Sequence, residues 1–435
     1  MGIVREKSNT ETVQRFISHD EEGLYIEVPF SVPEGVEQIK VVMEVSNDGV
    51  ASSIIDLGVR DQNRVRGWSG GARKEFYIHQ AKATPGYLHG AIEAGEWAVL
   101  LGSYKVAKPG CTVNVTIEYT LEQERWLIGD LHVHSVHSDG IFTLEENAGF
   151  AEKMGLDFIG LTDHNAASQN EAFPRDTNTL FIPGMELTTN KGHLNLFGAE
   201  DPVKDFRVST MDELHSRLKE ARDQGAYISF NHPYCRNTGW RWDWDFDYDW
   251  VEVWNGPWRE ENQNAVDWWH EQLVSGRRLV AVGGSDTHRP DPYVKHGMPA
   301  NWVYSKSLTS TEILKSINKG HVVLSYSPQG PFINLTCGDR MVGELCEEKD
   351  DQVVLKVNDV QFSDIVKVIS NEGNEQQVMV EEGLDTLELS WAIDNRTFYR
   401  VEVWRYFPQV KRRLMAALSN PIYFSNEGNL YKNKD

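Results

Sequence analysis

The sequence is poor in cysteine and in basic residues, and each shortage excludes a class of protein. Only four of its 435 residues are cysteines. Cys111, Cys235, Cys337 and Cys346 are spread too widely for the disulfide framework of a small secreted domain. We therefore expect reduced thiols in a cytoplasmic protein, although Cys337 and Cys346 could meet across a hairpin.

The shortage of basic residues bears on partners. Lysine and arginine total 43 against 65 acidic residues, so the net charge is −22. A surface of this charge repels phosphate backbones, and no basic patch interrupts it, so a long nucleic acid is not an expected partner.

Long hydrophobic runs are also missing. The N-terminal stretch MGIVREKSNTETVQRF lacks the apolar core of a signal peptide, and no run approaches the length needed to cross a bilayer. Hydrophobic residues make up 40% of the chain and aromatic residues 11%, which is enough to bury a core. We expect a globular protein of two or three domains that acts on a small-molecule substrate and needs no membrane. Composition does not indicate an oligomeric state.

Three regions follow one another along the chain. Residues 1–125 contain short runs rich in β-branched and aromatic residues, punctuated by turn residues, which predicts an N-terminal β-sandwich. Residues 126–330 alternate apolar strands with helical segments, which is typical of an α/β barrel. Residues 331–435 return to β-type alternation and predict a small C-terminal β domain.

Helix signals are clear in the middle region. Thr143 and Glu146 form a capping box, and Gly155 provides a stop. Residues 209–225 form an amphipathic pattern, residues 262–276 a further helical segment, and a helix follows Thr309.

The residues with metal-binding chemistry lie at the ends of the predicted barrel strands. In "DLHVHSVHSDG", His132 and His134 are two residues apart on a strand, so both side chains project to one face, where they could chelate one cation. Asp286 and His288 in "GGSDTH" repeat this spacing. The other candidates are His164 in "LTDHN", Glu186 in "PGMELTT", His232 in "FNHP" and Asp139 on the loop after the first pair.

This ligand set contains nitrogen and oxygen donors and no cysteine, which suits Zn, Mn or Fe. There are too many candidates for one ion. Two or three divalent metal ions that share Glu186 would account for them. Any single histidine is more often an ordinary buried or surface residue, but five strand ends that all carry His, Asp or Glu favour a metal site.

Taken in order, "DLHVHSVHSDG", "GLTDHN", "GMEL", "FNHP" and "GGSDTH" resemble the motifs of the PHP (polymerase and histidinol phosphatase) metal-dependent hydrolases. The flanking β domains, together with "ALSNPIYF" near the C-terminus, resemble the carbaryl-hydrolase-type branch of that family. The motifs span residues 126–330.

The resemblance implies an α/β fold with a distorted (β/α)7 barrel and a site for two or three metals. It assigns His132, His134, Glu186 and Asp286 to the first ion, and Asp139, His164, Glu186 and His232 to the second. His288 and His193 would bind a third ion, or would contact the phosphate of the substrate where that ion is absent.

Several neighbours of these motifs are candidates for supporting roles. Asp130 faces the same way as His132, and two roles are open to it, a carboxylate that orients His132 or a structural carboxylate. Asp163 should face away from the metals if His164 faces them. Lys191 and Arg236 could meet an anionic group, although solvated surface charge is the default for both. The run "WRWDWDFDYDW", which begins at Trp240, alternates aromatic and charged residues. It predicts either a packed extended segment or an aromatic wall beside the metals.

The leading functional hypothesis is a phosphoesterase in which a metal-activated hydroxide attacks a phosphoester. His288, His193 or His137 would protonate the leaving oxygen. The same hydroxide could instead cleave a carbamate, ester or amide of a small aromatic substrate. A third hypothesis is a metal-containing protein without catalysis that binds a carbohydrate or a protein.

Overall fold

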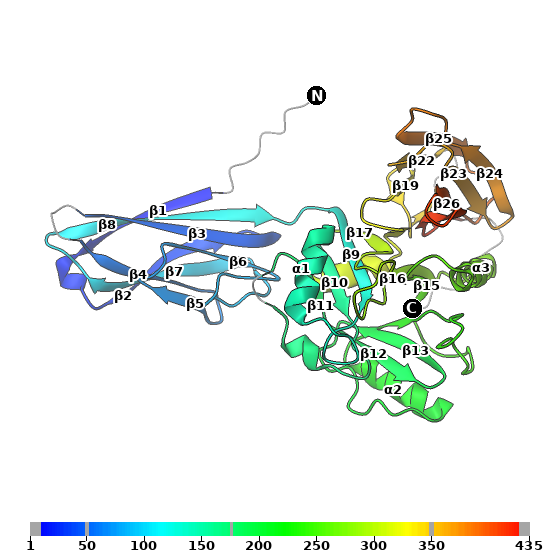
Figure 1. The fold of residues 1–435 in the computed structure, drawn as a ribbon. Coiled ribbons are helices and arrows are strands. Elements are labelled where there is room, and N and C mark those ends of the chain that lie inside the picture. The colour runs from blue at the N-terminus through cyan, green and yellow to red at the C-terminus, as the bar shows by residue number, and fades with distance from the viewer. Residues whose placement is uncertain (1–9, 48–51, 175–176, 348–351, 426–435) are drawn as a thin grey trace. The chain divides into compact units, whose positions relative to one another are not determined.

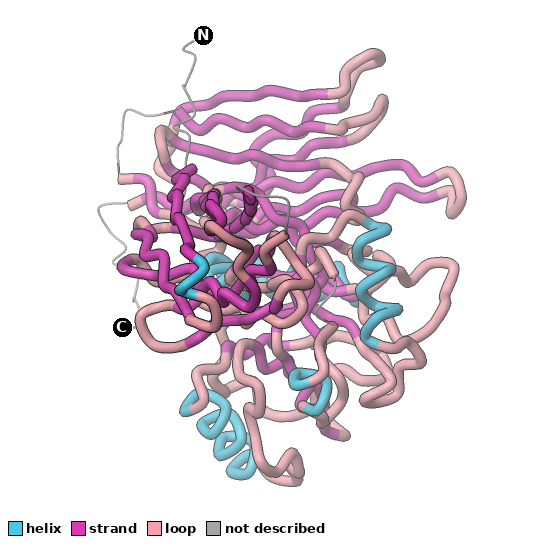
Figure 2. The backbone as a smooth tube through the Cα atoms, turned by 90° about the vertical axis from the view of Figure 1, so that its left-hand side faces the viewer, coloured by secondary structure: helices cyan, strands magenta, loops and turns pink. Residues whose placement is uncertain are grey.

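The computed structural model describes residues 10–47, 52–174, 177–347 and 352–425, in which strands far outnumber helices (Figure 2). The chain divides into two compact units. Unit 1 comprises residues 1–124 with 306–309, and unit 2 comprises residues 125–305 with 310–435. Within the described ranges, no helix has both the length and the apolar character needed to cross a membrane. The division into three domains stays a prediction.

Unit 1 consists of two four-stranded antiparallel sheets, with strand orders β1-β8-β3-β6 and β2-β7-β4-β5 (Figure 1). Its elements are β1 Thr10–Ser18, the 3-10 turn η1 His19–Glu21, β2 Tyr25–Val32, β3 Val36–Asn47, β4 Ile54–Arg60, β5 Val65–Gly70, β6 Glu75–His79, β7 Gly95–Lys105 and β8 Gly110–Leu121.

Alternation explains this arrangement. In β8 the buried side chains recur at every second position, from Cys111 through Val113 and Val115 to Ile117. These residues belong to one buried cluster with residues from both sheets, among them Trp97 of β7 and Ile39 of β3. Each strand therefore has one face in a core between two sheets and one face outside it.

Unit 2 combines the middle and C-terminal parts of the chain. Its helices are α1 Leu144–Met154, α2 Met211–Asp223, α3 Glu260–Val274 and α4 Ser310–Asn318, with a 3-10 turn η2 Ser168–Glu171. Its strands are β9 Arg125–Val133, β10 Phe158–Leu161, β11 Leu180–Ile182, β12 Gly184–Thr189, β13 Gly192–Phe197, β14 Tyr227–Phe230, β15 Trp250–Asn255, β16 Val280–Gly284, β17 Ala300–Ser305, β18 Val322–Ser325, β19 Phe332–Cys337, β20 Arg340–Met341, β21 Leu345–Cys346, β22 Gln352–Asn358, β23 Ile365–Ser370, β24 Gly373–Met379, β25 Thr386–Ala392, β26 Phe398–Phe407, β27 Arg412–Ser419 and β28 Ile422–Phe424.

The helix signals in the sequence correspond to helices in the structure. Thr143 caps α1 with the predicted capping box, and Gly155 ends it with φ 77° in the left-handed region. Helix α2 is capped in the same way by Thr210 and Glu213. Helix α3 starts at Glu260, two residues before the predicted segment, and ends at Val274.

Two sheets of unit 2 carry the candidate site. One is five-stranded in the order β12-β13-β14-β15-β16, with β13 antiparallel to both of its neighbours and β14, β15 and β16 parallel. In the other, β9 lies between the parallel β10 and the antiparallel β17, and the sheet continues through β18 to β27, β26, β23 and β24. The C-terminal strands thus extend the sheet that contains β9. A further sheet has the order β20-β19-β22-β25.

The pairing differs from the expected closed, mostly parallel barrel. The stretch "LFIPGMELTT" divides at Pro183 into β11 and β12, which belong to different sheets. Proline has no N–H for the ladder, which fits a break at this point. The strand ends of the two sheets are joined by the isolated parallel bridges Val133↔Thr287 and His164↔Glu186, and not by a continuous ladder of paired strands among the described residues. The structure is therefore a mixed α/β fold with unclosed sheets, and a (β/α)7 barrel is not shown.

Cys337 and Cys346 meet as the sequence allowed, but not across a hairpin, because β19 pairs with β20 and β22 whereas β21 pairs with β28. The two residues lie in β19 and β21, and their sulfur atoms are 2.8 Å apart in the C-terminal core.

Candidate metal centre

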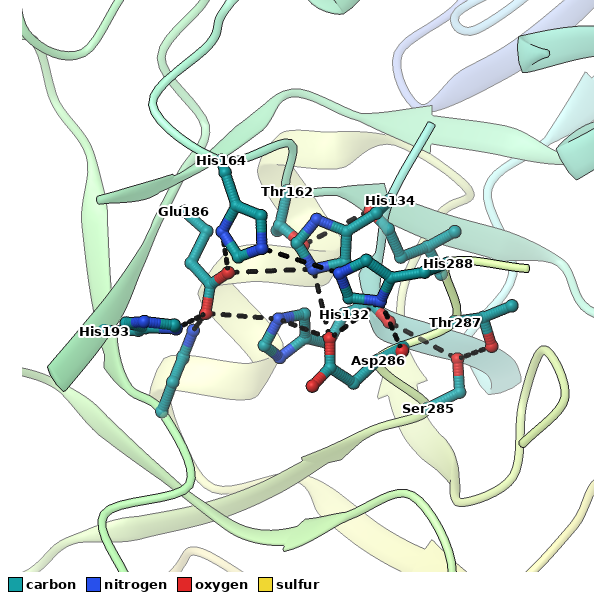
Figure 3. A network of polar contacts seen from close by, with 12 residues as sticks. His132, His134, Thr162, His164, Glu186, His193, Ser285, Asp286, Thr287 and His288 are labelled. Atoms are coloured by element: carbon teal, nitrogen blue, oxygen red, sulfur yellow. Dashed lines mark hydrogen bonds and ion pairs between the residues drawn. The ribbon is translucent and has the colours of Figure 1, made fainter. Parts of the chain in front are cut away.

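The predicted ligands converge where the two sheets of unit 2 meet (Figure 3). His132 lies on β9 and His134 directly follows it, and both are fully buried. Glu186 and His193 lie on the antiparallel pair β12 and β13, while His164, His232 and Asp286 follow β10, β14 and β16. Residues far apart in sequence thus reach one place because strands that end at the same edge of a fold deliver their side chains together.

These side chains form four overlapping groups whose ligand atoms lie within 4.8 Å of one another. The groups are His132, His134 and Asp286; His132, Glu186 and His232; His164, Glu186 and His193; and His134, Asp139, His164 and His288. Every residue predicted as a ligand belongs to at least one group. The groups differ from the expected ion sets. Asp139 and His232, which were expected at one ion, lie in different groups, and so do His193 and His288.

Glu186 is the hub of the cluster. Its carboxylate, which is 1% exposed, lies 2.7 Å from His164 Nδ1, 3.1 Å from His193 Nδ1 and 3.3 Å from His132 Nε2. Asn231 Nδ2 also donates a hydrogen bond of 2.9 Å to Glu186 Oε1. This is the geometry expected of a carboxylate that is shared between ions.

Asp286 occupies the other side of the cluster. Its Oδ1 lies 3.1 Å from His134 Nε2, 3.4 Å from His132 Nε2 and 3.5 Å from His288 Nδ1. Asp139 stands at the rim, with a side chain that is 58% exposed and an Oδ1 atom 3.3 Å from His288 Nε2. The cluster therefore has a buried interior and an exposed edge.

The backbone is held in unusual conformations at two of these positions. His232 has φ 25° and Asp286 has φ 56°, both in the region that favours glycine. The N–H of Asp286 donates to the carbonyl of His132 at 2.8 Å, and the N–H of His134 donates to the carbonyl of Thr287 at 3.0 Å. Such conformations persist where the surroundings fix them, and they concentrate at functional sites.

Buried charges determine the electrostatics of the metal-free cluster. Burial opposes the charged form of every group, but Glu252, Asp286 and Glu186 together raise the pKa of His132 well above its ordinary value. The same balance raises the pKa of His232 to about 9, against burial, chiefly through Glu186 and Glu252. The pKa of Glu186 is lowered well below its ordinary value, since His132 and His193 outweigh the effect of burial. Protonated imidazoles thus supply the positive charge that these carboxylates require.

The donor set fits divalent metal ions. Several buried atoms make no hydrogen bond of good geometry among the described residues, although charged groups of the cluster lie close to some of them. These atoms are His132 Nε2, His134 Nδ1 and Nε2, Glu186 Oε2 and His232 Nδ1. Native proteins satisfy nearly all buried polar atoms, and a bound metal ion is one explanation where other protein groups do not satisfy them. The nitrogen and oxygen donors without thiolate suit Zn, Mn or Fe.

Two predicted supporting residues fix backbone and loop groups. Asp130 accepts hydrogen bonds from the backbone N–H groups of His132, Ser285 and Gly297 at 3.1, 3.0 and 2.8 Å. Burial raises the pKa of Asp130 to about 6.

Asp163 accepts from the backbone N–H and hydroxyl of Ser135 at 2.8 and 2.7 Å, and from the hydroxyl of Ser138 at 2.6 Å. It thereby fastens the loop that follows His134.

None of the predicted substrate residues is a member of the four groups. Lys191 Nζ stacks over Trp242 at 4.1 Å from the ring centroid, and the side chain of Arg236 is 79% exposed. Trp240 is buried and packs edge-on against Phe230. The aromatic run therefore adopts the packed arrangement, since Trp244, Phe246 and Tyr248 also surround Phe230.

His137, predicted as a proton donor, lies outside all four groups and pairs through Nδ1 with Ser168 Oγ at 2.8 Å.

Three contacts to the predicted metal-binding residues were not predicted from the sequence. Glu252 of β15 lies 2.9 Å from His132 Nδ1, Thr188 Oγ1 lies 2.5 Å from His164 Nδ1, and Asn231 binds Glu186. A signal was available for Glu252, because it is an acidic residue inside the otherwise apolar stretch "WVEVW".

The chain matches no protein-family profile and no curated protein. A solved two-domain protein from Bacteroides vulgatus, described as containing a predicted PHP-like metal-dependent phosphoesterase, is 17% identical with a TM-score of 0.41, and the match covers 68% of this chain and 95% of that one.

Two further solved structures match smaller parts of the chain. A putative metal-dependent phosphoesterase from Bifidobacterium adolescentis is 15% identical with a TM-score of 0.28, and the match covers 43% of this chain and 94% of that one. An amidohydrolase from Chromobacterium violaceum, solved with bound sulfate and no metal, is 17% identical with a TM-score of 0.26, and the match covers 38% of this chain and 89% of that one. Similarity at this level assigns neither a family nor an activity to this chain.

Proposed function

We propose that this protein is a metal-dependent hydrolase of the PHP type, with a distorted barrel that carries two or three divalent ions and a small phosphoester as substrate. The observation that carries the proposal is the set of four overlapping ligand groups, two of which contain Glu186, with buried nitrogen and oxygen atoms that make no hydrogen bond of good geometry among the described residues. Ions held there would supply Lewis acidity, which makes water a stronger acid and stabilises negative charge on oxygen.

The residues of the chain would divide the remaining tasks. Glu186 and Asp286 supply the negative charge that holds the ions, each shared between at least two imidazoles. His288 lies at the rim, where its Nδ1 pairs with the carbonyl of Asp286 at 2.9 Å. Because a carbonyl only accepts, Nδ1 carries a proton, and Nε2, 3.3 Å from Asp139 Oδ1, would donate a second proton to the leaving oxygen from the imidazolium form.

Two features favour a phosphoester over an aryl carbamate or ester. Arg289 Nη2 lies 3.4 Å from the carbonyl of Asp139, so a guanidinium stands at the exposed edge of the cluster. A guanidinium suits the shape and charge of a phosphate. The aromatic run, which could have lined an apolar pocket for an aryl group, packs around Phe230 instead.

The test is metal analysis followed by assays on a substrate panel. The full chain would be reconstituted with Zn²⁺ or Mn²⁺ and tested on p-nitrophenyl phosphate, bis-p-nitrophenyl phosphate and 1-naphthyl N-methylcarbamate. We expect at least two ions per chain and hydrolysis of a phosphoester. Turnover of the carbamate alone would refute the phosphoester substrate in favour of carbamate or ester hydrolysis. Less than one ion per chain would refute the metal-dependent hydrolase.

A further inference from the structure

Glu252 is a buried carboxylate that contacts the cluster from behind. It lies on β15 between Val251 and Val253 and is 3% exposed. Its Oε1 lies 2.9 Å from Nδ1 of His132, on the side of the ring that faces away from Glu186 and Asp286. A carboxylate in such surroundings is costly unless each oxygen accepts hydrogen bonds.

The contact with His132 determines which nitrogen of the ring can bind a metal ion. An ionised carboxylate only accepts hydrogen bonds, so Nδ1 of His132 must be the donor. In the neutral ring the proton then sits on Nδ1, and the lone pair on Nε2 points between Glu186, at 3.3 Å, and Asp286, at 3.4 Å.

The second oxygen of Glu252 holds two further parts of the cluster. Oε2 accepts a hydrogen bond of 3.0 Å from the backbone N–H of His232, the residue with φ 25°. It also accepts one of 3.2 Å from Asn255 Nδ2, and the same amide lies 3.3 Å from Oδ2 of Asp286. One carboxylate therefore touches His132 and His232 directly and Asp286 through Asn255.

The neighbouring backbone is shaped around this contact. A Cβ atom on Gly284, at the end of β16, would lie 2.7 Å from Glu252 Oε1 and 2.2 Å from the Cβ of His132. Both distances are too short for real atoms, so the close approach of Glu252 to His132 depends on a residue without a side chain at position 284.

We propose that Glu252 is a positioning residue of the metal centre, which keeps His132 in the Nδ1–H tautomer and fixes the loops that carry His232 and Asp286. This inference rests on the metal-binding function proposed above and adds to it a residue outside the ligand set. Partners of this kind behind metal-binding histidines fix the ring and increase metal affinity.

Replacement by glutamine tests the proposal sharply, because neither orientation of the amide satisfies the site. With its oxygen toward His132, the glutamine NH₂ group would oppose the N–H of His232 and the NH₂ group of Asn255, which are also donors. With its NH₂ group toward His132, Nδ1 would have to accept, and the proton would move to Nε2, the atom that should bind metal.

We expect Glu252→Gln in the full chain to bind Zn²⁺ about 10- to 100-fold more weakly than the wild type in a chelator-competition titration. Glu271→Gln removes an exposed carboxylate from α3 and serves as the matched control, with unchanged affinity. Wild-type affinity in Glu252→Gln would overturn the inference.

A second measurement uses the wild-type chain and does not depend on a folded variant. Nitrogen-15 NMR of histidine-labelled protein, with His132 assigned by comparison with His132→Gln, should show a protonated Nδ1 in the Zn²⁺-loaded state. A protonated Nε2 would contradict the inference.

The outcomes separate this inference from the proposed function. A wild type that binds metal but cleaves no substrate on the panel would refute the hydrolase and leave the role of Glu252 standing. A wild type that binds no metal would overturn both.

Discussion

Buried charges in unit 1 and at the candidate metal centre of unit 2 are arranged in opposite ways. In unit 1, Arg66 and Asp61 are 6% and 8% exposed and form an ion pair at 3.1 Å. The guanidinium also donates to the carbonyls of Leu88, Gly90 and Ala91, and the carboxylate accepts from two backbone N–H groups at 2.7 Å. The polar groups of this pair are satisfied within the protein.

At the metal centre, imidazoles and carboxylates are buried as deeply, but several of their atoms have no hydrogen-bond partner. The comparison teaches that burial of charge alone does not identify a site. Buried charged groups whose hydrogen bonds are all made within the protein indicate a structural role. Buried imidazole nitrogens and carboxylate oxygens that converge without such bonds indicate a site that binds a ligand.

The largest effect should come from the hub of the cluster. We expect Glu186→Gln to weaken metal binding and to lower kcat/KM at least about a thousandfold, because residues that only support metal ligands already account for about 10- to 100-fold. Metal titration and assays would measure both quantities, with the exposed Glu145→Gln of α1 as control. Wild-type activity in Glu186→Gln would show that Glu186 is not needed at the site.

The converse change in unit 1 should affect stability alone. Arg66→Met leaves the carboxylate of Asp61 without its cation, and we expect it to lower the free energy of unfolding by about 3 kcal/mol. Metal binding should not change. The double variant Arg66→Met with Asp61→Leu should recover part of the loss in calorimetry, and a double variant as unstable as the single one would argue against the ion pair as the cause.

His296 in unit 2 is a buried histidine whose hydrogen bond is made within the protein, in contrast to the histidines of the candidate metal centre. His296 is 4% exposed, its Nε2 lies 2.7 Å from Asn147 Oδ1, and burial lowers its pKa to about 4. Because the unfolded chain takes up this proton first, the contribution of His296 is complete above pH of about 6.5 and is lost as the pH falls toward 4.

His296→Gln should therefore lose less stability than the wild type between pH 7 and pH 4, by up to about 3 kcal/mol, since each pKa unit is worth about 1.4 kcal/mol. Denaturant titrations at several pH values would measure this. The exposed His215→Gln is the control, and parallel curves for His296→Gln and the wild type would contradict the assignment.

The smallest effect is expected at His137. Because this ring pairs with Ser168 and belongs to none of the ligand groups, His137→Ala should lower kcat by less than about tenfold, or about 1.4 kcal/mol. A hundredfold loss in steady-state assays would restore its predicted role as a proton donor.

Local signals in the sequence correspond closely to local structure. The capping box at Thr143 and the stop at Gly155 bound α1, because helix ends are decided by residues within one turn. The spacing of His132 and His134 was sufficient to predict a shared face, since strand side chains alternate.

Strand pairing and side-chain contacts between residues far apart in the chain could not be predicted in the same way. Pro183 alone did not indicate that β11 and β12 enter different sheets, and the antiparallel direction of β13 depends on its pairing with β12 and β14. Glu252 was missed because its role exists only opposite His132, 120 residues away in the chain.

The sequence by itself determined which nitrogen and oxygen ligand atoms stand at the strand ends of this protein, because residue type and position along a strand are local properties. The tertiary structure decided how the donors are grouped, with Glu186 at the centre, His193 apart from His288 and Glu252 behind His132. It also decided that the aromatic run after His232 packs around Phe230. The physical reason is that hydrogen bonding and burial at this site join residues from separate strands, and only the folded chain brings those strands together.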